Sequence, residues 1–375
     1  MFAVATDQDR LHLRRALELA ERGRGAVSPN PLVGAVLVRN GAVIGEGFHA
    51  RLGGHHAEVV AIEDARARGA DPAGATLYLT LEPCAHHGRQ PPCTEAIVDA
   101  RIARVVIASE DPSEKASGRG PGILRDEGVT VEVVEGEEAA AARLLNQGFR
   151  KHARTGRPLV AVKSALSLDG RVATARGDSR WISGDASRRL VHRWRAESDA
   201  VCVGIGTALA DDPLLTAREV GALSQPMRVV FDSDARLPAS SELVGSIGEA
   251  PLFLVASPGA PIQRIEALKA AGAEVVTCDG DRRARVLAAL AELGRRGITT
   301  VMLEGGPTLT GSFFDAGEID ELRLFIAPIV IGGAEARPLA EGTGAAMIED
   351  AARALAMEWQ SSDSDLLVRA RMREW

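Results

Sequence analysis

The order of apolar and polar positions in the first part of the chain predicts alternating helices and strands. Residues 7–22 repeat apolar positions on one face, which is typical of an amphipathic helix that Asp7 could cap. The pair Asn40-Gly41 is preferred in two-residue hairpin turns and predicts a hairpin. The strands expected here are 32–38, 42–50, 75–83, 104–112 and 129–134, and helices are expected after His56 and after Pro92. Strands that alternate with helices indicate a sheet covered by helices.

A second series of elements follows a predicted helix and polar joint at 137–158. Its expected strands are 159–167, 200–206, 227–233, 252–257, 319–333 and 364–372, its expected helix is 184–199, and 262–278 and 281–306 each read as a helix followed by a strand. The chain has 375 residues, about twice the length of a typical single domain. We therefore expect two α/β domains, residues 1–147 and 148–375.

Composition and charge exclude several classes of protein. The net charge of −7 argues against a broad electrostatic grip on nucleic acid or on anionic membranes. Aromatic residues make up 3% of the chain, too few for the stacking platforms of a protein that binds single strands. No apolar run is long enough to span a bilayer, and the charged start of the chain is unlike a signal peptide. With four cysteines in all, we expect a cytoplasmic protein that binds neither nucleic acid nor a membrane.

Two short stretches carry candidate metal ligands. His56 and Glu58 lie at the start of a predicted helix, and Cys84 and Cys93 flank the segment before another. A catalytic zinc ion takes three protein ligands plus a water molecule, and His56, Cys84 and Cys93 supply that number. Glu58 would take a proton from the water and deliver it to a leaving amine. Because Pro83 ends a predicted strand, we expect Cys84 at a helix start, where the helix dipole favours a thiolate.

Simpler interpretations of these residues stay open. Cys84 and Cys93 could form a disulfide, although a reducing compartment disfavours it, or they could be unrelated thiols of the core. His55 is expected to face solvent or to support the site, since two adjacent residues rarely face one metal ion.

The pattern His-x-Glu, then Pro-Cys and a second cysteine, resembles the zinc-dependent cytidine deaminase superfamily. Eight residues rather than two separate the cysteines, and the insert AHHGRQPP is similar to that of the pyrimidine deaminases of riboflavin biosynthesis. PNPLVGAVLV, GEGFHARLGGHHAEV and TLEPCAHHGRQPPCTEAI resemble the same branch. The resemblance implies a cytidine-deaminase-like α/β/α sandwich with substrate contacts at Asn30, His49, His86, Arg89 and Asp111. Arg89 also offers the cation that a phosphorylated substrate needs, whereas His49 or His86 alone would more often be structural.

In the second half, residues 298–317 read as a strand, a Gly305-Gly306 turn and a helix. Glycines let a backbone approach a ligand closely, and the helix start, with Thr308, offers amides to an anion. By itself the pattern also fits an ordinary turn and cap, since no Gly-x-Gly-x-x-Gly fingerprint occurs at this turn.

Several stretches between residues 158 and 332 together resemble the reductase domain fused to that deaminase, among them VGIGTALADDPLLTAR and LEGGPTLTGSFFDAG. The resemblance implies a dihydrofolate-reductase-like α/β domain that uses NADPH. It implies cofactor contacts at Ala165, Trp181, Thr207, Asp211, Ser233, Gly306, Pro307, Thr308, Leu309, Thr310, Gly311 and Ser312. It implies substrate contacts at Ser179, Arg195, Leu215, Arg218 and Glu304. Arg195 and Arg218 could neutralise a phosphate ester, although the Arg-rich helix that carries Arg195 could equally present a solvated face.

The resemblance implies a bifunctional enzyme of riboflavin biosynthesis. The first activity would be zinc-dependent hydrolytic deamination of 2,5-diamino-6-(5-phosphoribosylamino)pyrimidin-4(3H)-one. The second would be NADPH-dependent reduction of the ribosyl group of 5-amino-6-(5-phosphoribosylamino)uracil to a ribityl group, for which no side chain stands out as the acid. We also expect a homo-oligomer, either a dimer or a tetramer.

Two alternatives belong to other classes of protein. A nucleic-acid base deaminase with an accessory binding domain is disfavoured by the lack of a basic stripe and of aromatic residues. A non-catalytic metabolite-binding protein is disfavoured by the intact His56, Glu58, Cys84 and Cys93 motif.

Overall fold

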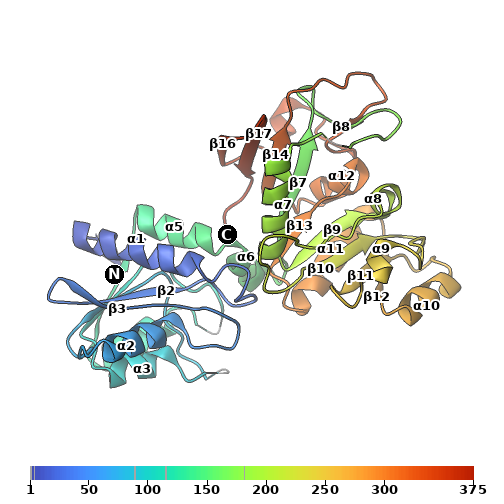
Figure 1. Cartoon of the computed structure of the whole chain (residues 1–375). Helices are drawn as coiled ribbons and strands as arrows, with labels where there is room; N and C mark the ends of the chain where they lie inside the picture. The colour runs from blue at the N-terminus through green and yellow to red at the C-terminus, as the bar shows by residue number, and fades with distance from the viewer. Residues whose placement is uncertain (1, 4, 88–89, 115, 181) are drawn as a thin grey trace. The chain divides into compact units, whose positions relative to one another are not determined.

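The chain folds into two compact units. The computed structural model describes residues 1–375 apart from 1, 4, 88–89, 115 and 181. Unit 1 comprises Met1–Gly156 together with Trp375, and unit 2 comprises Arg157–Glu374 (Figure 1). The predicted boundary after residue 147 lies where α5 (Glu137–Leu145) gives way to α6 (Gln147–Thr155), so α6 belongs by its contacts to unit 1.

Unit 1 is built on a six-stranded sheet. Its strands, in spatial order, are β1 (Phe2–Ala3), β6 (Thr130–Val134), β5 (Arg104–Ile107), β4 (Thr76–Leu79), β2 (Gly34–Arg39) and β3 (Ala42–Phe48). Strand β2 runs antiparallel to both β3 and β4, and the other neighbours are parallel. Asn40 and Gly41 both have positive φ, at 53° and 77°, so the predicted hairpin turn is confirmed.

Helices cover both faces of this sheet. Helices α1 (Asp7–Glu21) and α5 pack on one face, around a core that includes Leu13, Val36 and Tyr78 (Figure 1). On the other face, α2 (Ala57–Ala67), α3 (Cys93–Asp99) and α4 (Arg119–Asp126) enclose a second core with Ala61 and Ile97. The predicted α/β/α sandwich is therefore confirmed.

The cap of α1 differs from the expected one. Thr6, not Asp7, is the N-cap: its hydroxyl accepts the backbone N–H of Asp9, and the carboxylate of Asp9 accepts the N–H of Thr6. This reciprocal arrangement is a capping box, with aspartate in place of the usual glutamate. Threonine stands one residue before the apolar pattern begins, so the pattern alone placed the helix start one position late.

Unit 2 contains a nine-stranded sheet. Its strands, in spatial order, are β12 (Glu274–Thr277), β11 (Leu252–Ala256), β10 (Met227–Phe231), β9 (Ala200–Gly204), β13 (Thr300–Leu303), β7 (Leu159–Leu166), β14 (Glu321–Ile326), β17 (Asp365–Arg371) and β16 (Ala356–Ser362). The first seven are parallel, and the last two join as an antiparallel hairpin. Strands β8 (Arg171–Ala173) and β15 (Arg337–Pro338) form a separate pair.

The helices of unit 2 also lie on two faces. One core joins the sheet to α7 (Asp185–Glu197), α8 (Ile205–Asp211), α9 (Glu242–Gly245) and α10 (Ile262–Ala270). The other core joins it to α11 (Arg282–Arg295) and α12 (Pro307–Asp315). Because the strands are parallel, the loops after β9, β10, β13 and β7 meet at one edge of the sheet, where ligands of open α/β sheets bind.

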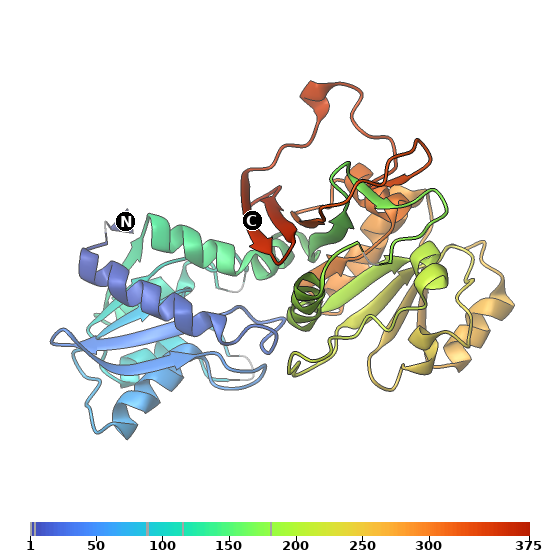
Figure 2. The ribbon, with the colours of Figure 1, turned by 45° about the horizontal axis from the view of Figure 1, so that its top comes forward.

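Three departures from expectation concern the large sheet of unit 2. The strand expected at 319–333 ends at Ile326, and the chain then runs away from the sheet toward the short 3-10 helix Ile348–Asp350 (Figure 2). The stretch 200–206 is a strand only to Gly204, after which α8 begins. Strand β16 had no prediction, because its residues are exposed up to Ser362 and mix apolar with polar types. No helix in the described part of the chain has the length and apolarity needed to cross a membrane.

Candidate active sites

In unit 1, the start of α2 carries two of the predicted functional residues. His56 is the N-cap residue of α2, and Glu58 lies buried in its first turn. Helix α2 packs closely on β3, because Gly45 and Gly47 have no side chains. A Cβ atom at Gly47 would overlap the carbonyl oxygen of Ala57 at the start of α2. The two glycines therefore fix how near the strand the His56 turn lies.

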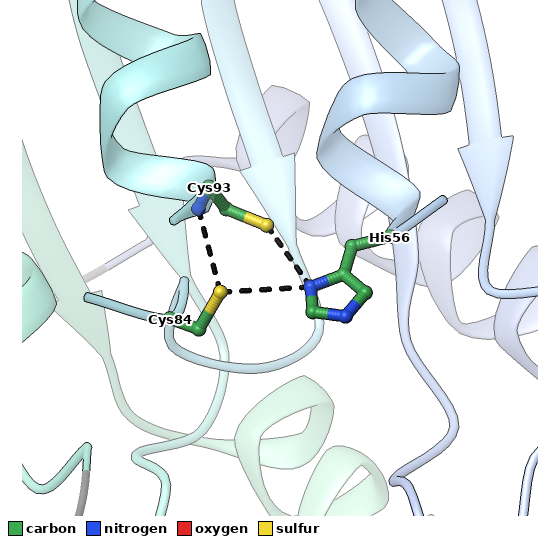
Figure 3. Close-up of side chains that lie close together, drawn as sticks. All are labelled: His56, Cys84 and Cys93. Atoms are coloured by element: carbon green, nitrogen blue, oxygen red, sulfur yellow. Dashed lines mark hydrogen bonds between the residues drawn. The ribbon is translucent and has the colours of Figure 1, made fainter. Parts of the chain in front are cut away.

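The two cysteines approach His56 from the segment between β4 and α3. Nδ1 of His56 lies 3.2 Å from Sγ of Cys93 and 3.5 Å from Sγ of Cys84 (Figure 3). The candidate ligand atoms all lie within 4.8 Å of one another. Both cysteines are free thiols, so the disulfide alternative is wrong. His55 points elsewhere: it is exposed, with Nδ1 3.2 Å from Oε2 of Glu63.

The position of Cys84 corrects one expectation. Strand β4 ends at Leu79, and Cys84 lies in the following loop rather than at a helix start. Cys93 is the residue that begins a helix, α3, after Pro92. The backbone N–H of Cys93 nevertheless donates to Sγ of Cys84 at 3.3 Å, so an amide at the helix start does face that sulfur.

Burial and neighbouring groups shift the acidity of this cluster. The two thiols share a hydrogen bond, which lowers the pKa of Cys84 and raises that of Cys93. Burial raises the pKa of Glu58 to about 7, helped by the negative charge that Cys84 can carry. A carboxyl group with a pKa near 7 can both accept and return a proton at neutral pH.

The donor set fits a zinc ion. One imidazole nitrogen and two sulfurs are the ligand types that zinc prefers, and three protein ligands leave a fourth position open for water. Glu58 is two residues from His56 and is influenced by both Cys84 and Cys93, so its carboxyl group lies beside the ligand candidates. The same arrangement can hold a metal ion and move a proton next to it.

Two of the residues implied as substrate contacts lie beside the metal-ligand candidates. His49 is buried, with Nε2 3.1 Å from Nδ2 of Asn30 and Nδ1 3.1 Å from the carbonyl oxygen of His55. Its ring packs edge-on against that of His56, with centroids 5.3 Å apart. Burial lowers the pKa of His49, so the neutral ring donates to His55 and accepts from the Asn30 amide.

The other implied contacts form a looser group. His86 is exposed and Asp111 is half-buried, and burial raises the pKa of Asp111 although hydrogen bonds from Ser113 oppose the rise. Arg89 lies outside the described residues. Sequence reasoning missed Glu82, a buried carboxyl group two residues before Cys84 whose Oε2 accepts the N–H of Asp111 at 3.4 Å. A glutamate within three residues of the end of a buried apolar strand was the signal that could have revealed it.

In unit 2, the Gly305-Gly306 turn joins β13 to α12. Gly306 is the N-cap residue of α12, with no side-chain cap, and a Cβ atom there would lie 3.4 Å from Oγ1 of Thr207. The turn therefore leaves space beside α8 and keeps the first amides of α12 without a side-chain cap. The hydroxyl of Thr308 donates to Oε2 of Glu341 at 2.8 Å, so this implied cofactor contact already has a partner.

The later residues of the implied cofactor segment belong to the body of α12. Thr310 and Ser312 are buried, and their hydroxyls donate to the carbonyl oxygens of Gly305 and Thr308. Pro307 and Gly311 are buried as well, while Leu309 is half-buried. Of the implied segment, the start of the helix is the part that a ligand could reach most directly.

A charged cluster joins side chains from β7, from α7 and from the residue after β13. Arg195 on α7 donates two hydrogen bonds to the carboxylate of Glu304, at 2.7 and 2.9 Å. Nζ of Lys163 lies 3.9 Å from the same carboxylate. Burial would raise the pKa of Glu304, but the charge and hydrogen bonds of Arg195 outweigh it and hold the pKa at about 2. Burial lowers the pKa of Lys163.

This cluster changes how two implied substrate contacts are understood. Arg195 is not on a solvated face: it is largely buried and paired with Glu304, so its charge is already balanced. Sequence reasoning missed Lys163. A lysine within the otherwise apolar strand pattern LVAVKSAL was the available signal, since buried lysines need a partner or a function.

The remaining implied contacts are spread around this edge. Leu215 is buried with a φ of 55°, and Arg218 is exposed, with its guanidinium donating to Oγ1 of Thr216 at 2.9 Å. Ser179 and Ala165 are half-buried, and Asp211 is exposed at the end of α8. Ser233 follows β10 and accepts a hydrogen bond from Arg285. Trp181 lies outside the described residues.

Comparison with known proteins assigns each unit to a family model. Residues 6–109 match the cytidine and deoxycytidylate deaminase zinc-binding region, and residues 158–368 match the RibD C-terminal domain. The riboflavin biosynthesis protein RibD of Actinobacillus pleuropneumoniae is 38% identical over 368 residues, which cover 98% of this chain and 96% of that protein. The protein of the same name from Escherichia coli (strain K12) is 38% identical, over 92% of this chain and 94% of its own.

Solved structures agree with these matches over the whole chain. RibD of Acinetobacter baumannii superimposes with a TM-score of 0.87 at 36% identity and covers 98% of this chain and 99% of its own. The diaminohydroxyphosphoribosylaminopyrimidine deaminase/5-amino-6-(5-phosphoribosylamino)uracil reductase of Thermotoga maritima gives a TM-score of 0.85 at 35% identity. It covers 98% of this chain and 99% of its own.

Proposed function

The chain belongs to the riboflavin biosynthesis protein RibD family, and from this premise we propose that it catalyses two consecutive steps, a deamination and a reduction. We assign the deaminase to residues 1–147 and the reductase to 148–375. The observation that carries the proposal is that each half of one chain holds its own polar site. One is the His56, Cys84 and Cys93 cluster beside buried Glu58, and the other is the Lys163 and Glu304 pair beside the Gly305-Gly306 turn.

The first step is hydrolysis of the 2-amino group of 2,5-diamino-6-(5-phosphoribosylamino)pyrimidin-4(3H)-one. Water adds at the ring carbon that carries the amino group, ammonia leaves, and an oxo group remains. A zinc ion held by His56, Cys84 and Cys93 supplies the activation of that water when it is bound. Glu58 takes the proton from the water and returns it to the leaving nitrogen, for which its burial beside the ligands is suited.

His49 and Asn30 have a positioning role in this proposal. The neutral ring of His49 is fixed by hydrogen bonds at both nitrogens, so it holds Asn30 and borders the His56 ring in one orientation. A His49 ring held in one orientation restricts how a planar pyrimidine can bind beside it. The Asn30 side chain is the group that would meet the ring of the substrate.

The second step is reduction of the ribosyl group of 5-amino-6-(5-phosphoribosylamino)uracil to a ribityl group. NADPH supplies the hydride when it is bound, and the start of α12 after Gly306, which has no side-chain cap, suits the pyrophosphate. Hydride addition to the open-chain imine at C1 of the sugar leaves a nitrogen that needs a proton. Lys163 is a cation with a lowered pKa, and Glu304 keeps it in place, so we assign proton delivery to this pair.

We further propose that the enzyme is a cytoplasmic homo-oligomer. Four free thiols suit a reducing compartment. Strand β16 forms an edge of the large sheet, and Met357 and Trp359 on it are 60% and 67% exposed. An exposed edge strand with large apolar side chains is a surface that a second copy of the chain can cover. Trp359→Glu should lower the molecular mass measured by light scattering, and an unchanged mass would argue against this surface.

Both activities can be tested in one assay. We would incubate the full chain with the diaminopyrimidine phosphate and NADPH, and record ammonia and NADPH absorbance together. Ammonia release followed by NADPH oxidation is expected. NADPH oxidation that does not depend on prior ammonia release would contradict the proposed order, and release of neither product would contradict the function.

A further inference from the structure

Two buried polar side chains at the start of α6 have no part in the deaminase chemistry described above. Asn146 is the N-cap residue of this helix and Arg150 lies four residues later, and their side chains are 4% and 1% exposed. Burying an amide or a guanidinium costs free energy unless its donors and acceptors are paired. The groups that pair with Asn146 and Arg150 lie in two loops of unit 1, the Asn30 loop (residues 27–33) and the Asp111 loop (residues 108–113).

The amide of Asn146 binds the Asn30 loop. Its Oδ1 accepts the backbone N–H of Leu32 at 2.8 Å, and its Nδ2 donates to the carbonyl oxygen of Leu32 at 2.9 Å. These two bonds hold both backbone groups of one residue, as an antiparallel neighbouring strand would. Leu32 lies two residues after Asn30, whose side-chain amide contacts His49 beside the metal-ligand candidates. Asn146 therefore sets the position of the backbone that presents Asn30.

The guanidinium of Arg150 binds the Asp111 loop. Its Nη1 donates to Oγ of Ser109 and to the carbonyl oxygen of Glu110, both at 3.1 Å, and its Nη2 donates to Oε1 of Glu110 at 2.8 Å. The N–H on Nε donates to the carbonyl oxygen of Trp375, which also belongs to unit 1. Three of these charge-assisted bonds end on the two residues directly before Asp111, so Arg150 fixes the backbone from which the Asp111 side chain extends.

The side chain of Asp111 is tied to its own loop. Its Oδ1 accepts the backbone N–H of Ser113 at 2.8 Å, and the N–H of Asp111 itself donates to Oε2 of Glu82 at 3.4 Å. A carboxyl group that is bound to its own loop moves with that loop. Loss of the Arg150 contacts should therefore displace the carboxyl group of Asp111 as well as the chain before it.

We propose that Asn146 and Arg150 are positioning residues of the deaminase, which hold the Asn30 loop and the Asp111 loop in the arrangement that binds the pyrimidine substrate. The inference rests on the proposed deaminase function. Arg150 lies beyond residue 147 yet within unit 1, so the reaction depends on the start of α6 although the metal ligands and the proton carrier lie elsewhere. Misplacing a binding group by about 1 Å can cost roughly a hundred-fold in rate, so bonds that locate the two loops control the reaction without touching the substrate.

The test uses the full chain and measures ammonia release against the concentration of the diaminopyrimidine phosphate. The variants are Asn146→Ala, Arg150→Met and Glu110→Ala. The side chain of Glu110 is 50% exposed, so its removal cuts one contact of Arg150 without opening the interior. Gln147→Ala is the matched control, because Gln147 lies on the same turn and hydrogen-bonds to Trp375 but, within the described residues, to neither loop. Zinc content, thermal unfolding and reduction of supplied 5-amino-6-(5-phosphoribosylamino)uracil are measured for each variant.

The expected result is weaker use of the substrate with the metal retained. Asn146→Ala and Arg150→Met should raise KM for ammonia release by roughly ten-fold or more and change kcat less, because the metal ligands and Glu58 stay in place. Glu110→Ala should raise KM by a smaller factor, and Gln147→Ala should match the unaltered protein. Each variant should keep its zinc and its rate of reduction.

Three outcomes would overturn the inference. They are an unchanged KM in folded Asn146→Ala and Arg150→Met, an equal rise of KM in Gln147→Ala, and a loss of zinc that accounts for the whole loss of activity. If neither Asn146→Ala nor Arg150→Met folds, Glu110→Ala decides, and an unchanged KM in that variant would reject the role of Arg150. If the unaltered protein released no ammonia, the proposed deaminase function itself would fail.

Discussion

Glu58 combines a buried carboxyl group with a place beside three metal-ligand candidates. We predict that Glu58→Gln keeps the metal but lowers the rate of ammonia release by roughly two to four orders of magnitude, because an amide cannot carry the proton. Glu63→Gln is the matched control, since Glu63 lies on the same helix with an exposed side chain. Near-normal ammonia release from Glu58→Gln would assign the proton transfer to another group.

Cys84 tests the metal assignment separately from catalysis. Replacing its sulfur with the weaker oxygen ligand of serine leaves His56 and Cys93 as the strong donors. We expect Cys84→Ser to be purified with much less than one zinc per chain, as measured by elemental analysis. Cys278→Ser in unit 2 should retain its zinc. Full occupancy in Cys84→Ser would remove this cysteine from the ligand set.

Glu304 should make the stability of unit 2 depend on pH. Its pKa of about 2 in the folded protein lies below the ordinary value of 4.5. The contribution of the ionised carboxylate to stability is therefore complete above about pH 4.5 and disappears as the pH falls toward 2. We predict that the difference in unfolding temperature between the unaltered protein and Glu304→Gln shrinks on acidification below 4.5. A difference that stays constant from pH 6 to pH 3 would show that the ion pair with Arg195 does not stabilise the fold.

Among the elements, the contact between β3 and α2 is the one that positions a site. We predict that Gly47→Val lowers both stability and zinc content, because its side chain must displace the start of α2, where His56 lies. Gly122→Ala in α4 is the control: a Cβ atom there meets nothing, so the change should be neutral or slightly stabilising. Thermal unfolding and elemental analysis measure both effects. Full zinc content in Gly47→Val would mean that the strand does not set the position of the metal site.

The elements also show why sequence reasoning reached some features and missed others. Local signals sufficed for the Asn40-Gly41 hairpin and for α3 after Pro92, because turn and cap chemistry acts over a few residues. The pairing of Arg195 with Glu304 spans 109 positions in the chain, so no local pattern could reveal that the charge of this arginine is balanced. Lys163 was missed for the same reason, because its partner Glu304 follows a different strand and is distant in the sequence.

At the scale of the whole molecule, each of the two compact units contains its own candidate active site. We predict that Glu58→Gln still reduces supplied 5-amino-6-(5-phosphoribosylamino)uracil at a normal rate. Conversely, a variant with both Lys163 and Glu304 changed to neutral residues should still release ammonia. NADPH absorbance and ammonia measure the two rates. If Glu58→Gln also lost the reduction, the units would depend on each other for activity.

The last residue of the chain, Trp375, belongs to unit 1 rather than to unit 2. Its carbonyl oxygen accepts hydrogen bonds from Gln147 and from the buried guanidinium of Arg150, and its ring lies 5.3 Å from Nζ of Lys151. Unit 1 therefore includes a half-buried residue that follows the whole of unit 2 in the sequence. An affinity tag fused directly behind Trp375, or a protease that removes this residue, should therefore disturb unit 1, although unit 2 immediately precedes Trp375 in the sequence. Expression vectors for this enzyme should carry the tag at the other end.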